Sequence, residues 1–139
     1  MGVNINYITD GDIAGVLSVI GQNPKNDIYY STGGGPEGVL AAAALSCYGG
    51  QIQGRLVLDN EEKIRAKKLG ITDFDKKYNI EDMVKGDVIF CATGVTSGDL
   101  AKGVVDLGNE YEVSSFVLHK SESTIKSIKN IYNKWIHLH

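Results

Sequence analysis

The sequence predicts an α/β fold, as a layered helix/sheet/helix domain with a mostly parallel central sheet. Three observations carry this prediction. Segments rich in β-branched and aromatic residues alternate with segments of helix formers. The run "VIFCA" at 88–92 is apolar without a break, which is typical of a strand buried on both faces. Glycines gather in turns that directly follow predicted strands.

The expected elements alternate along the chain. Strands are predicted over 4–8, 28–31, 51–58, 87–92 and 111–118. Helices are predicted over 13–20, 37–48, 61–69 and 80–84, with a last helix that begins after Ser123 as its N-cap. In this last helix one face would carry Ile125, Ile128, Ile131 and Trp135.

Length and composition favour one compact domain over 1–139. The chain has 139 residues, of which 42% are hydrophobic, and contains neither a linker nor a repeat. A net charge of -3 offers no basic surface for nucleic acid. No apolar stretch approaches the roughly 20 residues of a membrane span, so we expect a cytoplasmic protein without a membrane partner.

The most informative segment is "TGGGPEG" at 32–38, a glycine turn between a predicted strand and a predicted helix. Pro36 suits the first helical position, and Glu37 would lie in the first turn, against the positive end of the helix dipole. Free N–H groups at such a turn attract phosphate or carboxylate, and the Glu37 carboxylate attracts a metal ion. A purely structural role for the glycines and for Glu37 is the alternative.

Two further loops share the expected carboxyl edge of the sheet, namely "TDGD" at 9–12 and "ATGVTSGD" at 92–99. Asp10 and Asp12 suit sugar hydroxyls or a cation, although one of these loop residues could instead cap the following helix. The glycine turn also matches the dinucleotide pattern G-x-G-x-x-G, with Asp59 where the ribose-binding acid would be. Against that alternative, the charge of Glu37 would repel a pyrophosphate.

Four motifs in this order, DGD (10–12), PEGVLAAAA (36–44), QGRL (53–56) and ATGVT (92–96), give the chain its resemblance to a known family. It resembles the class II, bacterial-type fructose-1,6-bisphosphatases, which often also act on sedoheptulose-1,7-bisphosphate. The resemblance extends over essentially the whole chain but corresponds only to the C-terminal part of that family's polypeptide. It implies the fold of the lithium-sensitive sugar phosphatase superfamily and hydrolysis of the 1-phosphate with Mg²⁺ or Mn²⁺.

The resemblance also assigns residues. Glu37 matches a metal-ligand glutamate, Gly34 matches a substrate-contacting glycine, and Asp10, Gly11 and Asp12 match a substrate-contacting segment. No residue of this chain matches a catalytic one. The family's other metal-binding carboxylates and its phosphate-holding loop precede the residue that matches Met1.

We therefore expect the isolated chain to be inactive and to act with the missing N-terminal half, supplied in cis or in trans, and as a homo-oligomer. A non-catalytic module that binds a sugar phosphate is the second hypothesis, and a dinucleotide-binding domain is the third. An exposed apolar face that drives association is a further, structural alternative.

Overall fold

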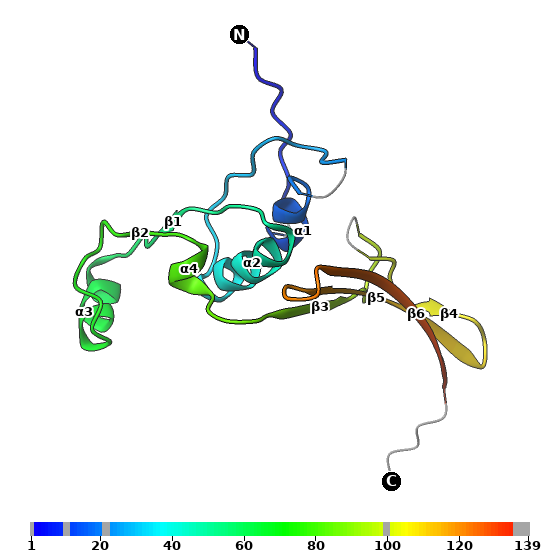
Figure 1. Cartoon of the computed structure of the whole chain (residues 1–139). Helices are drawn as coiled ribbons and strands as arrows, with labels where there is room; N and C mark the ends of the chain where they lie inside the picture. Colours follow the sequence, from blue (N-terminus) through cyan, green and yellow to red (C-terminus); the bar gives the residue numbers. More distant parts are fainter. Residues whose placement is uncertain (1, 10–11, 21–22, 99–100, 135–139) are drawn as a thin grey trace.

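The computed structural model describes residues 2–9, 12–20, 23–98 and 101–134. Two helices, α1 (Asp12–Leu17) and α2 (Gly35–Tyr48), pack against a four-stranded sheet (Figure 1). The sheet is made of β3 (Ile89–Thr93), β4 (Val105–Asp106), β5 (Glu110–His119) and β6 (Thr124–Asn133). A second unit lies away from the sheet and consists of β1 (Gly54–Arg55), α3 (Asn60–Lys68) and β2 (Lys77–Tyr78), with α4 (Ile80–Met83) following it.

The mixed helix and sheet content is confirmed, but the expected parallel sheet is wrong. Every strand pair among the described residues is antiparallel: β1 with β2, and β5 with each of β3, β4 and β6. The reason lies in the connection between β5 and β6. A turn of four residues joins these strands, and so short a connection can join only antiparallel neighbours.

The final element is a strand, although we predicted a helix from Ser123. Isoleucines at every third position share one face of a helix but alternate between the two faces of a strand, whereas β6 is rich in β-branched residues, which favour strands. Its ten residues pair with β5 over its full length, from Glu110↔Asn133 to His119↔Thr124. Ser123 lies in the preceding turn, and Trp135 lies outside the described residues.

Two predicted strands, over 4–8 and 28–31, are not strands in the structure. No described strand pairs with them, and their apolar side chains are largely exposed, as at Tyr7 (90%) and Tyr30 (92%). The strand predicted over 51–58 is reduced to the two residues of β1. A strand needs a neighbouring strand for its backbone hydrogen bonds, and the local sequence does not indicate whether one is available.

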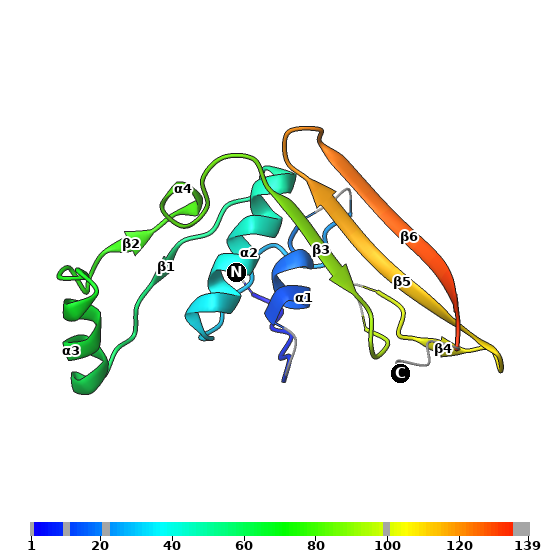
Figure 2. The same cartoon turned by 90° about the horizontal axis from the view of Figure 1, so that it is seen from below.

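The core lies between α2 and its two neighbours. On one side, Ala41 and Leu45 pack with Val16 of α1, and on the other side Ala44 packs with Phe90 of β3 and Leu118 of β5. The alanines allow both neighbours to approach the α2 backbone closely. In β3 burial alternates, so that Phe90 is 7% exposed and Ile89 is 62% exposed, because the described helices cover only one face of the sheet (Figure 2).

The predicted helices over 37–48, 61–69 and 80–84 are confirmed within one or two residues as α2, α3 and α4, and α1 covers the first part of the helix predicted over 13–20. Within the described residues, none of these helices combines the length and apolarity needed to cross a membrane.

Candidate functional site

The start of α2 is built by local sequence signals. Gly34 is the N-cap, with φ -70° and ψ 153°, and its carbonyl accepts a hydrogen bond from the Gly38 N–H (3.1 Å). Pro36 lies in the first turn, where its missing N–H leaves no helical bond unmade. At the other end Gly49 adopts a left-handed conformation (φ 71°), and its N–H bonds to the carbonyl of Leu45.

Gly34 and Glu37, two of the predicted site residues, lie against each other. A Cβ added at Gly34 would collide with the Oε2 atom of Glu37, so the carboxylate folds back over the glycine backbone. Both residues are exposed. The turn therefore presents a carboxylate, folded over the Gly34 backbone, at the positive end of a 14-residue helix.

The start of α1 lies at the same end of the molecule as the start of α2. Val16 of α1 packs with Ala41 of α2. Ile20 follows four residues later and lies near the end of α2, because a Cβ added at Gly50 would be 3.1 Å from its Cγ2 atom. The two segments therefore run parallel, so that their first residues are neighbours (Figure 2).

The end of β3 points the same way. At its beginning, the carbonyl of Val88 accepts a weak hydrogen bond from Cys47 near the end of α2 (3.8 Å), and Phe90 contacts Ala44 one turn earlier. Thus β3 and α2 run in opposite directions, but they diverge from this contact, so that α1 lies between the start of α2 and the loop after Thr93 (Figure 2). Of the three loops predicted to lie at one edge of a parallel sheet, only 32–38 is described in full, and parts of 9–12 and 92–99 lie outside the described residues.

The predicted substrate-contacting segment is only partly described. Asp10 and Gly11 lie outside the described residues, and Asp12 begins α1. Only the position of Asp12 in the backbone, at the end of α1 that lies nearest the start of α2, bears on the predicted site.

The described residues do not form a metal centre by themselves. Glu37 supplies one carboxylate, and within 2–9, 12–20, 23–98 and 101–134 no group of three or more His, Cys, Asp or Glu residues is arranged to hold an ion. Protein sites for Mg²⁺ combine one or two carboxylates with water and substrate phosphates. Glu37 fits the role of one ligand, and the remaining ligands have to come from elsewhere.

The structure also bears on the dinucleotide alternative, which needs Asp59 as a ribose-binding acid. Asp59 caps α3: its Oδ1 accepts a hydrogen bond from the Glu62 N–H (2.8 Å), and the Glu62 carboxylate accepts one from the Asp59 N–H (2.9 Å). This reciprocal pair is a capping box, and α3 lies away from the start of α2 (Figure 1). A structural role therefore accounts for Asp59.

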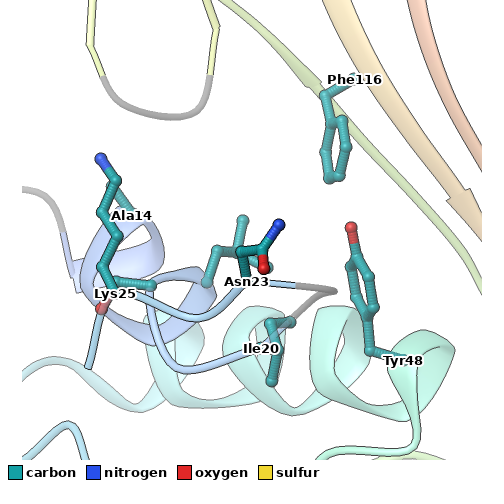
Figure 3. Close-up of a pocket in the computed structure, with 8 residues that line it drawn as sticks. Ala14, Ile20, Asn23, Lys25, Tyr48 and Phe116 are labelled. Carbon is teal, nitrogen blue, oxygen red and sulfur yellow. The ribbon is translucent and has the colours of Figure 1, made fainter. Parts of the chain in front are cut away.

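A cavity of about 220 Å³ lies beside α1, and sequence reasoning did not predict it (Figure 3). The phenol of Tyr48 points toward the ring of Phe116, and burial raises the pKa of Tyr48. The polar rim is formed by Ser18, Asn23 and Lys25. These residues come from separate segments, and no local pattern joins them. Gly34 and Glu37 do not line this cavity.

Comparison with known proteins identifies the family. The family described as bacterial fructose-1,6-bisphosphatase, glpX-encoded, matches residues 1–132. A D-fructose 1,6-bisphosphatase class 2/sedoheptulose 1,7-bisphosphatase from Synechococcus sp. (strain JA-3-3Ab) is 34% identical over 96% of this chain and 42% of its own length. The fructose-1,6-bisphosphatase class 2 of Haemophilus influenzae is 35% identical over 95% of this chain and 44% of its own length.

The chain thus spans less than half the length of these relatives. The matched region nevertheless includes the helix start that carries Gly34 and Glu37 and the loop that follows β3. Because the family model covers 132 of the 139 residues, the chain belongs to the glpX-type bacterial fructose-1,6-bisphosphatases, a family of phosphatases.

Proposed function

We propose that this chain forms the C-terminal part of a metal-dependent fructose-1,6-bisphosphatase, with Glu37 as one metal ligand and Asp10, Gly11, Asp12 and Gly34 as substrate contacts. The observation that carries the proposal is the position of the Glu37 carboxylate, folded over Gly34 at the start of α2. The substrate proposed is fructose-1,6-bisphosphate, with sedoheptulose-1,7-bisphosphate as a second one, since the Synechococcus relative is named for both sugars.

The chemistry of the donors supports these roles. A carboxylate at the positive end of a helix dipole can hold Mg²⁺ or Mn²⁺, which would supply the charge that stabilises a phosphoryl group in transfer. Gly35 and Gly38 have open space beside them, which leaves room for a sugar phosphate to approach the N–H groups of the helix start. Carboxylates in the 10–12 segment would accept hydrogen bonds from sugar hydroxyls.

The chain alone is proposed to be inactive, because Glu37 is a single ligand and two-metal chemistry needs several. The rest of the site would come from an N-terminal half of the protein, joined in cis or in trans. We also propose that the chain folds as one domain over 1–139 with the fold of the lithium-sensitive sugar phosphatase superfamily. The complete protein is proposed to be a homo-oligomer in the cytoplasm.

Reconstitution tests the proposal. The 139-residue chain is assayed for Mn²⁺-dependent phosphate release from fructose-1,6-bisphosphate, alone and mixed with the N-terminal part of the Haemophilus influenzae relative. We expect no turnover alone and measurable turnover in the mixture. Glu37→Gln should then lower the rate by roughly 100-fold or more, since loss of a metal ligand removes several kcal/mol of stabilisation.

Glu61→Gln is the matched control, because Glu61 also lies in the first turn of a helix and is exposed. It should leave the rate unchanged. Turnover by the chain alone would refute the proposed dependence on a second half, and a fully active Glu37→Gln mixture would refute the assigned metal ligand.

A further inference from the structure

A cluster of polar side chains lies at the opposite end of the molecule from Glu37, at the turn between β5 and β6 (Figure 2). Asp87, just before β3, is its centre. Its Oδ1 accepts hydrogen bonds from the N–H groups of Val88 (2.9 Å) and Ser121 (3.0 Å). Its Oδ2 accepts one from the Ser121 hydroxyl (2.8 Å) and lies 2.8 Å from Nε2 of His119. One carboxylate thus joins the turn to the start of β3.

Both ring nitrogens of His119 face carboxylate oxygens. Nε2 lies 2.8 Å from Asp87 Oδ2, and Nδ1 lies 3.4 Å from Glu122 Oε2. A neutral imidazole carries a proton on one nitrogen only, whereas an imidazolium carries one on each. Only the protonated ring can therefore donate to both carboxylates at once.

The geometry points to a pH-dependent attachment of the β5–β6 turn to the start of β3, with His119 as the titrating group. The proton on His119 supplies the second donor and a positive charge between two negative ones. When it leaves, one ring nitrogen becomes an acceptor and can no longer donate to the carboxylate that it faces, although Nε2 also lies 3.1 Å from the Ser121 hydroxyl. One of the two pairs is then lost, and so is the positive charge that attracts both carboxylates.

The electrostatics agree with this geometry. Hydrogen bonding to Asp87, followed by the charges of Asp87 and Glu122, raises the pKa of His119 above its ordinary value of 6.5. Hydrogen bonds from Ser121 and then His119 hold the pKa of Asp87 well below its ordinary 3.8. Two other titratable groups lie close: Lys120, whose Nζ donates to the Gly86 carbonyl (3.4 Å), and Cys47 of α2, whose pKa is raised by burial.

The directions of these two pKa shifts define the pH range in which the turn is held most strongly. A raised histidine pKa stabilises the folded turn fully below pH 6.5, and this contribution is lost as pH rises through the pKa of His119 in the folded protein. A lowered aspartate pKa contributes above pH 3.8 and is lost as pH falls toward the pKa of Asp87 in the folded protein. The attachment is therefore strongest between about pH 4 and pH 6.5 and loosens as pH rises through the pKa of His119 in the folded protein.

The turn also shapes a second cavity, of about 530 Å³, at the end of α2. Lys120 lines it together with Ser46, Asn79 and Glu81. The Lys120 N–H donates to the Val88 carbonyl (2.9 Å), so the backbone position of Lys120 depends on the same contact between turn and strand. A change in the protonation of His119 therefore acts on one wall of this cavity.

Nuclear magnetic resonance of the 139-residue chain tests the inference without reference to phosphatase activity. We expect His119 to titrate above pH 6.5. The Ser121 amide should exchange with solvent more slowly, relative to its intrinsic rate, when His119 is charged, by about tenfold for each pH unit by which the His119 pKa is raised. In His119→Gln this pH dependence should disappear.

Variants of the carboxylates identify the cause. Asp87→Asn should bring the His119 pKa back toward its ordinary value, and Glu122→Gln, at a side chain that is 67% exposed, should lower it by less. Asp106→Asn is the control, because Asp106 pairs with Lys134 instead, and it should leave the His119 pKa unchanged. An ordinary His119 pKa in the unmodified chain would overturn the inference, as would Ser121 exchange that shows no step at the His119 titration.

Discussion

Ser123 shows how a single residue can carry backbone strain at a turn. Among the described residues it is the one non-glycine with a positive φ (49°). It is the last residue of a turn closed by a hydrogen bond from its own N–H to the Lys120 carbonyl (3.2 Å), and β6 begins at the next residue. A left-handed backbone brings the Cβ of an L-residue too close to the following carbonyl.

Ser123→Gly should therefore stabilise the protein by about 1 kcal/mol, because glycine adopts this conformation without the steric cost. The measurement is urea unfolding followed by circular dichroism. Ser121→Gly is the contrasting variant in the same turn. It removes the hydroxyl that bonds to Asp87 and should destabilise the protein. A Ser123→Gly protein that is less stable than its parent would contradict the role assigned to φ at this residue.

At the scale of a residue and its neighbours, sequence reasoning reached the Glu37 turn and missed the His119 cluster. Gly34 and Glu37 are three positions apart, so helix-start signals alone predict that they lie together. His119 and Asp87 are 32 residues apart and meet only because β3 and β5 pair. Before that pairing is known, nothing in either segment indicates the contact.

At the scale of an element, helices with chemical signals at both ends were predictable. Pro36 and Gly49 mark the limits of α2 within a run of strong helix formers, and the Asp59–Glu62 pair marks the start of α3. The element β6 was not predictable in this way. Its isoleucine spacing of three satisfies a helical face, whereas the deciding factor is the ten-residue pairing with β5, a contact between segments.

The capping box of α3 gives a prediction for one element. Asp59→Ala should destabilise the protein by about 1 kcal/mol, because the Glu62 N–H loses its acceptor at the helix start. Asp59→Asn should recover most of that loss, since asparagine caps about as well as aspartate. Thermal unfolding of the parent and the two variants measures these differences in stability. Equal melting temperatures for the parent and Asp59→Ala would contradict the capping role.

At the scale of the whole molecule, the helices and the antiparallel sheet are held together where α2 meets β3 and β5. Leu118 is completely buried there against Ala44 and Phe90. The sequence indicates which residues are apolar, but not which face of a sheet a helix covers. The prediction of a sheet covered on both faces fails for that reason, and the apolar residue Ile89 is exposed on the uncovered face.

Leu118→Ala should lower the free energy of unfolding by about 2–5 kcal/mol, because it leaves a cavity between the sheet and α2. Leu69→Ala is the matched control, since Leu69 is 80% exposed and should cost much less. Urea denaturation of both variants measures the difference. Similar losses for the two substitutions would show that Leu118 is not at the centre of the core.

We expect the outer edge of β6 to influence how the protein behaves in concentrated solution. Ten residues pair with β5 on one side, and no described strand pairs with the other side, so a row of backbone N–H and C=O groups stays open to a second molecule. Lys126 and Lys129 place positive charges along β6, of which Lys129 lies 4.0 Å from the Glu112 carboxylate of β5, and like charges keep two such edges apart. In 1 M salt the screening length falls to about 3 Å, so this repulsion fades and aggregation through β6 accelerates.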